Sequence, residues 1–289
     1  MAIDIYKINP EFRDIMPKEI IELEENATWA MNQEKPRGIK ELPETKELLE
    51  EHSLCAGCPE AAALRYVLSA LPKPEETIIV NSTGCTSLMF PHIALHTVHS
   101  LFGNQNAVAS GIKRVLDWRF PETEKDVVVL AGDGATVDIG LDYTLQSFFR
   151  QEKITTICFD NEVYANTGGQ ESGATAKGQV FKMAPTGKKF DKVPMWELAT
   201  TSGCHYVMNM TASAPKAVAK AVREAILVAR EIGPTFLNIY TPCILEIGLS
   251  ANEGLGEMKD QDKGRFTAYK HVSDEAEAYL KKCKAEGKL

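Results

Sequence analysis

The fold is decided by Asp126–Gln170, which reads DVVVLAGDGATVDIGLDYTLQSFFRQEKITTICFDNEVYANTGGQ. This stretch begins with an apolar, β-branched run that ends in the turn Gly132–Gly134. A helical pattern over 138–150 and a second apolar run over 154–159 follow. We therefore predict a strand, a helix and a second strand, in which the two strands are parallel and end at the same edge of a sheet.

Polar side chains gather where these two predicted strands end. Asp133 follows the first strand between two glycines, and Asp160, Asn161 and Asn166 follow the second. The glycines let the backbone approach a ligand closely, and N–H groups near the start of a helix suit a phosphate. Carboxylate and amide oxygens are ligands that Mg²⁺ accepts. A Gly-Asp-Gly sequence alone is more often a plain turn, but the asparagine-containing turn after the next strand favours a magnesium-diphosphate site.

The two turns together resemble a known cofactor motif. Gly132–Gly134, the 26 residues 135–160 and then Asn161 are similar to the motif of thiamine diphosphate (TPP) enzymes. The continuation Asp160–Gln170 more closely resembles the diphosphate-binding domain of the 2-oxoacid:ferredoxin oxidoreductases, the pyruvate:ferredoxin oxidoreductase group.

This resemblance implies roles for individual residues. Mg²⁺ would be held by Asp133, the side chain of Asn161 and the carbonyl of Val163. Asn166 would lie beside the thiazolium ring of TPP and the substrate, as the catalytic residue. The other residues expected to bind the cofactors are Glu60, Gly84, Cys85, Gly132, Gly134, Ala135 and Tyr164.

Composition places the chain in the ordinary globular class. Its 289 residues are 44% hydrophobic and 25% charged, which suits one large α/β domain with extensions or two modest domains. The net charge of −8 and the lack of a basic stripe argue against a nucleic-acid surface. No window approaches a membrane span of about 20 apolar residues, and the first residues do not begin a signal peptide. We expect a cytoplasmic protein that does not bind a membrane.

The strand-like runs alternate with helical patterns along most of the chain. This alternation predicts an α/β fold with a doubly wound parallel sheet, a diphosphate-type TPP-binding domain with N- and C-terminal extensions. We expect an N-terminal arm over 1–50, the TPP- and [4Fe–4S]-binding domain over 51–250, and a C-terminal helical extension over 251–289. The predicted strands start near 77, 126, 154, 206 and 236, and the predicted helices cover 61–71, 107–118, 138–150, 195–201, 215–232 and 273–284.

Two other segments have less regular patterns. The polar stretch 171–193 is a long loop, typical of a lid, a ligand loop or an interface. The stretch 89–102 carries His92, His96 and His99 at helical spacing, but its apolar neighbours favour a packed segment over a metal-binding face.

Seven cysteines, an odd number, argue against a disulfide framework in a chain that lacks an export signal. Cys55-x-x-Cys58 is compatible with a zinc knuckle, a redox pair or half of an iron–sulfur site. Cys85 and Cys243 each follow a predicted strand at the same edge as Asp133, so four thiolates can converge there. Spacing does not separate zinc from a [4Fe–4S] cluster. We expect the remaining three cysteines to be ordinary apolar thiols: Cys158, Cys204 and Cys283.

The order of the cysteines resembles the cluster ligands of the same oxidoreductase group. That resemblance implies one [4Fe–4S] cluster held by Cys55, Cys58, Cys85 and Cys243 next to TPP. Glu60 matches a position that contacts TPP in the family. The chain departs from the pattern at residue 59, a proline where members often have glycine, which predicts an altered local turn.

By resemblance, the reaction is oxidative decarboxylation of a 2-oxoacid with coenzyme A, giving an acyl-CoA, CO₂ and two electrons. The expected partners are an α subunit whose pyrimidine-binding domain supplies the activating glutamate, a γ subunit, and a ferredoxin-like δ subunit or another electron acceptor. The chain would be active only with these subunits. Pyruvate is the default substrate, with phenylglyoxylate, oxalate or a branched 2-oxoacid as alternatives. Two other functions stay open: a non-redox TPP decarboxylase with structural zinc, and a non-catalytic assembly subunit that carries the cluster.

Overall fold

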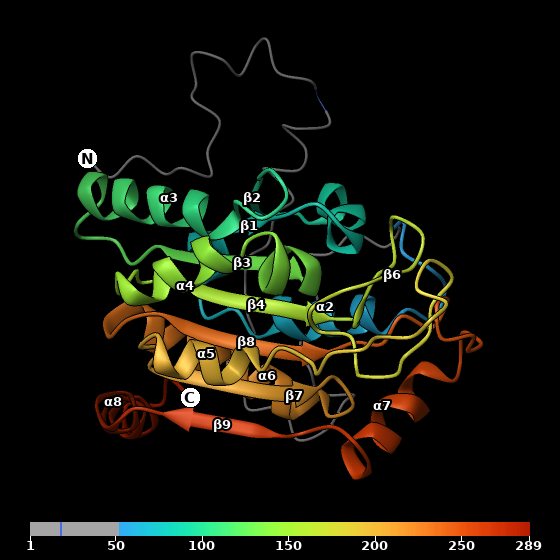
Figure 1. Ribbon diagram of the computed structural model, residues 1–289. Coiled ribbons are helices and arrows are strands. Elements are labelled where there is room, and N and C mark those ends of the chain that lie inside the picture. Colours follow the sequence, from blue (N-terminus) through green and yellow to red (C-terminus); the bar gives the residue numbers. More distant parts are fainter. Residues whose placement is uncertain (1–17, 19–51) are drawn as a thin grey trace.

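A mostly parallel sheet forms the centre of the protein. The computed structural model describes Lys18 and residues 52–289, and the predicted arm over 1–50 lies outside the described residues apart from Lys18. In the described part, seven strands form the sheet in the order β2 (His96–His99), β1 (Thr77–Asn81), β3 (Asp126–Gly132), β4 (Thr155–Asp160), β8 (Thr235–Tyr240), β7 (Tyr206–Thr211) and β9 (Tyr269–Val272) (Figure 1). All neighbours are parallel except β9, which runs antiparallel to β7.

Helices cover both faces of the sheet (Figure 1). One face is covered by α2 (Pro59–Ser69), α6 (Pro215–Glu231) and, beside α6, α8 (Asp274–Ala285). The other face is covered by α3 (Gln105–Arg119), α4 (Leu141–Phe149) and α5 (Met195–Thr201). This arrangement confirms the predicted doubly wound α/β fold.

Strand β3 explains why the central strands read as unbroken apolar runs. Val128 and Leu130 belong to the core on the side of α2 and α6, whereas Val127, Val129 and Ala131 belong to the core under α3. Successive side chains of a strand point to opposite faces, so a strand with helices on both sides needs apolar residues at every position.

The sequence prediction missed two strands of this sheet, β2 and β9, and also the short hairpin strands β5 (Val163–Tyr164) and β6 (Gln170–Glu171). Strands β2 and β9 are short strands at the edges of the sheet, and their residues are half-buried or exposed. Edge strands have one unpaired side and often carry polar residues, so their sequences lack a continuous apolar run. In β2, the histidines at His96 and His99 belong to this strand and not to a helical face. The helix α7 (Gly254–Lys263), within the predicted C-terminal extension, was also missed.

The helix predicted over 138–150 is shorter than expected. The chain first forms a π-type turn, η6 (Gly134–Asp138), and α4 begins only at Leu141. The helices predicted around α2, α3, α5, α6 and α8 are confirmed. Pro59 and Pro215 are the first residues of α2 and α6. A proline is favourable at this position because the first N–H of a helix has no hydrogen-bond partner within the helix. The long loop over 171–193 is also confirmed. It contains one isolated bridge, between Phe181 and Ala184.

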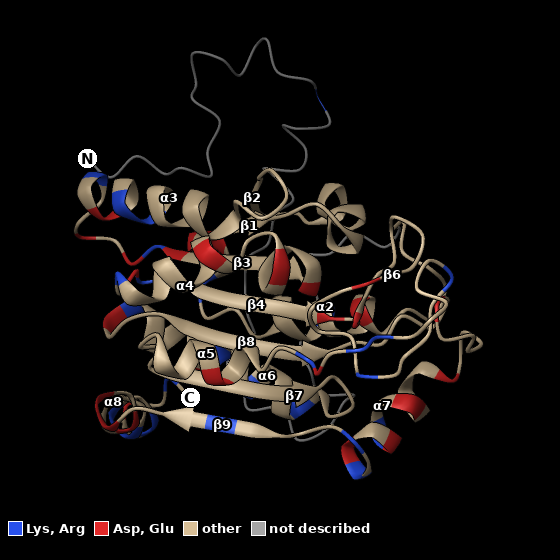
Figure 2. Cartoon of the chain, viewed as in Figure 1, with Lys and Arg blue, Asp and Glu red and all other residues tan. Residues whose placement is uncertain are grey.

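Charged residues lie mainly on helices and loops, and the central strands carry few (Figure 2). At the carboxyl edge of the sheet, the loops that follow the parallel strands carry both positively and negatively charged residues (Figure 2). In the described part of the chain, none of the helices has both the length and the apolar composition needed to cross a bilayer.

A core substitution in β3 should measure the importance of this strand. Leu130 is fully buried, and Leu130→Ala is expected to lower the free energy of unfolding by about 2–5 kcal/mol because it leaves a cavity. Leu101→Ala is the matched control, since Leu101 is 75% exposed. Urea unfolding followed by circular dichroism would measure both. Equal effects of the two substitutions would contradict the assignment of β3 to the core.

Candidate active site at the carboxyl edge of the sheet

Four strands bring the predicted site residues to one edge. In the parallel register, Asn81 of β1 pairs with Leu130 of β3, Gly132 of β3 with Phe159 of β4, and Asp160 of β4 with Tyr240 of β8. The strands therefore end side by side. The residues that directly follow them include Cys85, Asp133, Asn161 and Cys243.

Asp133 lies at the centre of this edge and is almost completely buried, with 2% of its surface exposed. Its Oδ2 accepts a hydrogen bond from the Ser172 hydroxyl at 2.5 Å. Burial, together with the negative charge of Asp160, raises the pKa of the Asp133 carboxyl well above its usual range. A bound cation would offset both effects. The chemistry of this carboxylate therefore fits a divalent metal ion.

The turn after β4 orients Asn161 and Val163. The Asn161 side-chain oxygen accepts from the Val163 N–H at 3.1 Å, and the Val163 carbonyl accepts from the Ala165 N–H at 2.9 Å. Between them, Glu162 adopts a left-handed conformation with φ of 64°, which is uncommon for a residue other than glycine. The turn then enters the hairpin of β5 (Val163–Tyr164) and β6 (Gln170–Glu171). Asn166 is exposed in the connection of this hairpin.

Glycine occupies positions 132 and 134 of the site for different structural reasons. A Cβ at Gly134 would lie 2.3 Å from Cε1 of Tyr164, so this glycine makes room for the tyrosine ring. Tyr164 in turn donates to Asp138 Oδ2 at 2.7 Å. A Cβ at Gly132 would meet only the Phe159 carbonyl oxygen, at 3.9 Å, so the backbone is open there.

The backbone before Cys85 also requires glycine. Gly84 has φ of 141° and open space around its Cα, and it begins a short 3₁₀ turn, η4 (Cys85–Leu88). On the opposite side of β3, the Ala135 carbonyl accepts from the buried side chain of Gln105 at 2.8 Å, which fixes the start of η6.

The four cysteines of the predicted cluster lie near one another. Cys58 precedes α2, Cys85 follows β1 and Cys243 follows β8. The loop after β8 packs on the Cys55–Cys58 loop, because a Cβ at Gly57 would lie 1.9 Å from the Ala251 carbonyl oxygen. All seven cysteines are free thiols. As predicted, Cys158, Cys204 and Cys283 are buried, away from these four.

Burial, with smaller effects of neighbouring acids and thiols, raises the pKa values of Cys58, Cys85 and Cys243. Burial is the largest cause, and it raises the pKa of Cys58 to about 12 with a contribution from Glu60. The pKa of Cys85 is raised by burial, by Glu60 and then by the thiols of Cys243, Cys58 and Cys55. Such effects require short separations. The described residues nevertheless contain no group of three or more His, Cys, Asp or Glu side chains that could hold a single metal ion.

Glu60 is a buried acid next to these thiols. It lies in the first turn of α2, its surface is 2% exposed, and its Oε1 has no hydrogen-bond partner among the described residues. Burial raises its pKa to about 7. A buried, unpaired carboxyl oxygen is costly, so Glu60 is a good candidate for contact with a bound ligand. Pro59, where the chain departs from the family pattern, occupies the first position of the helix and does not displace Glu60.

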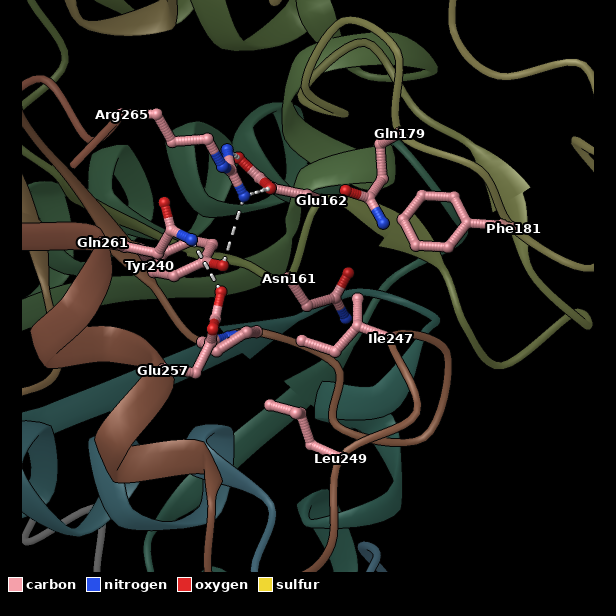
Figure 3. A pocket seen from close by; sticks show the side chains of 11 residues that line it. Asn161, Glu162, Gln179, Phe181, Tyr240, Ile247, Leu249, Glu257, Gln261 and Arg265 are labelled. Atoms are coloured by element: carbon pink, nitrogen blue, oxygen red, sulfur yellow. Dashed lines mark hydrogen bonds and ion pairs between the residues drawn. The ribbon is translucent and has the colours of Figure 1, made fainter.

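A cavity of about 160 Å³ lies on the β8 side of Asn161 (Figure 3). Within it, Arg265 binds Glu162, and Gln261 donates to Glu257 at 2.8 Å. Phe181, Ile247 and Leu249 are among the apolar residues that line it. Of the predicted metal ligands, Asn161 lines this cavity, whereas Asp133, Val163 and the four cysteines do not.

Three residues of the site were missed by sequence reasoning: Ser172, Lys192 and Arg265. Lys192 binds Asp160 at 2.5 Å and Glu162 at 3.0 Å, and Arg265 binds Glu162 at 2.7 Å. Although burial raises the pKa of Glu162, these two cations lower it below its usual range. A lysine or arginine in a polar loop gives no sequence signal of such a pairing. Ser172, two residues after the Asp160–Gln170 motif, could have been found by extending that motif.

Comparisons with known proteins agree with this geometry. Residues 82–239 match a family described as thiamine pyrophosphate enzyme, C-terminal TPP binding domain. The chain is 32% identical over 253 residues to the pyruvate synthase subunit PorB of Methanosarcina barkeri. The matched region covers 80% of this chain and 84% of that subunit. The chain belongs to the β-subunit family of the 2-oxoacid:ferredoxin oxidoreductases. The resemblance noted in the sequence is thereby confirmed.

More distant relatives extend the comparison. The 2-oxoglutarate synthase subunit KorB of Archaeoglobus fulgidus is 28% identical over 214 residues, covering 73% of this chain and 77% of that subunit. A 2-oxoglutarate:ferredoxin oxidoreductase structure from Magnetococcus marinus has the same fold, with a TM-score of 0.60 and 24% identity over 70% of this chain and 68% of that one. As a β subunit of this family, the chain carries the TPP-binding domain of an oxidoreductase that works with partner subunits.

The buried carboxyl of Asp133 should make the stability of the metal-free β subunit depend on pH. Because its folded pKa is raised, the carboxyl destabilises the folded state increasingly as pH rises above its unfolded pKa. Asp133→Asn should therefore raise the Tm in EDTA, and more at pH 8 than at pH 5. The penalty removed is about 1.4 kcal/mol for each pH unit by which the pKa is raised.

Asp260→Asn is the control for this measurement, since Asp260 is exposed on α7. Its Tm should follow that of the unsubstituted protein at both pH values. A lower Tm for Asp133→Asn than for the unsubstituted protein at pH 8 would show that Asp133 is compensated in the metal-free state.

Proposed function

We propose that the chain is the β subunit of a pyruvate:acceptor oxidoreductase that uses TPP, Mg²⁺ and one [4Fe–4S] cluster. In this reaction, pyruvate and coenzyme A give acetyl-CoA, CO₂, one proton and two electrons. The observation that carries the proposal is that two groups lie at one edge of the sheet. One is the buried carboxylate of Asp133, and the other is the set of cysteines that precede α2 and follow β1 and β8, with the buried Glu60 beside them.

The residues at the first group fit a magnesium-diphosphate site. Asp133, the Asn161 side chain and the Val163 carbonyl would hold Mg²⁺, and they supply the hard oxygen ligands that this ion requires. The open backbone at Gly132 allows the diphosphate to approach. When bound, TPP supplies the electron sink for decarboxylation. Asn166, exposed in the β5–β6 connection, would contact the substrate, and Glu60 would contact the cofactor.

A four-iron cluster is favoured over structural zinc by the order of the four cysteines, which resembles the cluster ligands of the family to which the chain belongs. A [4Fe–4S] cluster binds its four thiolates on different iron atoms, so the sulfurs are neighbours without converging on one point. The pKa of Cys85 is raised first by burial and then by Glu60, Cys243, Cys58 and Cys55, which is consistent with neighbouring thiols. Cys55 would be the fourth ligand.

Pyruvate is the substrate that the relatives favour. PorB of M. barkeri, a pyruvate synthase subunit, is 32% identical, and KorB of A. fulgidus, a 2-oxoglutarate synthase subunit, is 28% identical. 2-Oxoglutarate is therefore the second candidate. The α subunit would supply the activating glutamate and most of the substrate contacts, and the γ and δ subunits would complete the path to ferredoxin or another acceptor.

The two cofactor sites should be separable by mutation. In the assembled complex, Asp133→Ala is expected to abolish Mg²⁺-dependent TPP binding and to leave the iron content unchanged. Cys243→Ser is expected to do the reverse, lowering the iron content of the complex by up to about four atoms per β subunit while TPP still binds. Isothermal titration and iron analysis would measure both, and each variant is the control for the other. Loss of TPP and iron together in both variants would contradict two separate sites.

A substrate panel tests the reaction itself. The purified complex should reduce a viologen dye with pyruvate and coenzyme A at a higher kcat/KM than with 2-oxoglutarate, oxalate or phenylglyoxylate. A preference for 2-oxoglutarate would replace the proposed substrate but keep the class. Failure to reduce the dye with any 2-oxoacid by a complex that contains TPP and iron would contradict the proposed function.

A further inference from the structure

The loop over 171–193 contacts both turns of the proposed magnesium-diphosphate site. Ser172, at its start, donates its hydroxyl hydrogen to Asp133 after β3. Lys192, at its end, binds Asp160 and Glu162 on either side of Asn161. One loop therefore holds the two segments that would supply the metal ligands.

The Ser172 hydroxyl has three hydrogen-bonding neighbours, of which the Thr175 hydroxyl, at 3.4 Å, is the most distant. It accepts a hydrogen bond from the Ala174 N–H at 3.2 Å, and it donates to Asp133 Oδ2 at 2.5 Å. The Ser172 N–H donates to the Thr175 hydroxyl at 2.8 Å. Within the described residues, Ser172 is the hydrogen-bond partner of the Asp133 carboxylate. One carboxylate oxygen is thus occupied, and the other is left for a cation.

The same segment of the loop also holds the second turn. The Thr175 hydroxyl donates to the Glu162 carbonyl, and the Lys188 ammonium group donates to the Ser172 carbonyl. Ser172, Thr175 and Lys188 are all buried. These contacts support Glu162 in its left-handed conformation and so fix the position of Asn161 next to it.

We propose that Ser172 is a positioning residue for the metal ion: its hydroxyl sets the orientation of the Asp133 carboxylate, and through it the 171–193 loop and the bound Mg²⁺–TPP order one another. This inference rests on the proposed function, because it requires the cofactor to bind at Asp133. Coupling between two binding equilibria is reciprocal. If the ordered loop favours Mg²⁺–TPP, then Mg²⁺–TPP must stabilise the loop.

Two measurements on the assembled complex test this inference. The first is amide hydrogen exchange of peptides from 172–192, with and without Mg²⁺–TPP, compared with peptides from α8. The second is the Mg²⁺ concentration that gives half-maximal TPP binding. We expect Mg²⁺–TPP to slow exchange in the loop and not in α8. Ser172→Ala should raise the half-saturating Mg²⁺ concentration about 10-fold, the size typical of residues that orient a metal ligand.

Ser213→Ala is the matched control. The Ser213 hydroxyl also donates to a carboxylate, Asp262 Oδ2, at 2.5 Å, but it follows β7, which β8 separates from β4. Its Mg²⁺ dependence should equal that of the unsubstituted complex. Ser172→Thr, which keeps the hydroxyl, should restore most of the Mg²⁺ affinity lost in Ser172→Ala.

The results separate this inference from the proposed function. If TPP and Mg²⁺ bind the unsubstituted complex but leave exchange in the loop unchanged, the inference is wrong and the proposed function stands. The same holds if Ser172→Ala titrates like Ser213→Ala. The exchange measurement needs no substitution, so it decides the question even if Ser172→Ala fails to assemble. If the unsubstituted complex does not bind TPP with Mg²⁺, both the proposed function and this inference are wrong.

Discussion

The neutralisation of buried carboxylates at the strand ends is the constraint on which this site depends. Asp133 and Asp160 end neighbouring strands, both are buried, and the charge of Asp160 raises the pKa of Asp133. Lys192 binds Asp160, and Asn238 adds a hydrogen bond at 2.9 Å. Among the described residues, the hydrogen bond to the Asp133 carboxylate comes from the Ser172 hydroxyl. A cation beside Asp133 would neutralise its buried charge. Asp160 is already compensated by Lys192 and Asn238. Asp133 is therefore the candidate metal ligand, and Asp160 is not.

The thiols extend the same edge in the direction of α2. Their loops come from three separate parts of the chain, which meet because β1 and β8 end at one edge and the loop after β8 packs on Gly57. Glu60 lies among them, and its Oε1 has no hydrogen-bond partner within the part of the chain that the structure describes. A short distance between an electron sink and an electron acceptor is what an oxidative decarboxylation requires. The topology of the sheet, rather than any single motif, therefore accounts for the joint placement of the two proposed cofactors.

The sequence predicted the elements whose patterns are fixed by burial. Strands β3 and β4 are covered on both faces, so they read as continuous apolar runs, and the turns that follow them could be placed from sequence. Strands β2 and β9 could not, because an edge strand needs no such pattern. The π-type turn η6 was also missed. A single turn of this kind before α4 changes the spacing of the apolar residues too little to be recognised in the sequence.

For the site, the sequence indicated the residues within motifs but not those that hold them. Asp133, Asn161 and the four cysteines stand at recognisable positions, and their proposed roles follow from the family resemblance. Lys192 and Arg265 come from distant segments and act through their charge. Such pairing depends on tertiary structure, and the sequence of a polar loop does not reveal it.

The central claim is that a metal-bound diphosphate and an iron–sulfur cluster share one edge of this sheet. Anomalous X-ray diffraction at the iron absorption edge, from crystals of the assembled complex with Mg²⁺–TPP, tests it most directly. We expect iron density enclosed by Cys55, Cys58, Cys85 and Cys243, and a diphosphate beside Asp133 in the same β subunit. Iron density elsewhere, or a diphosphate bound away from Asp133, would contradict this account.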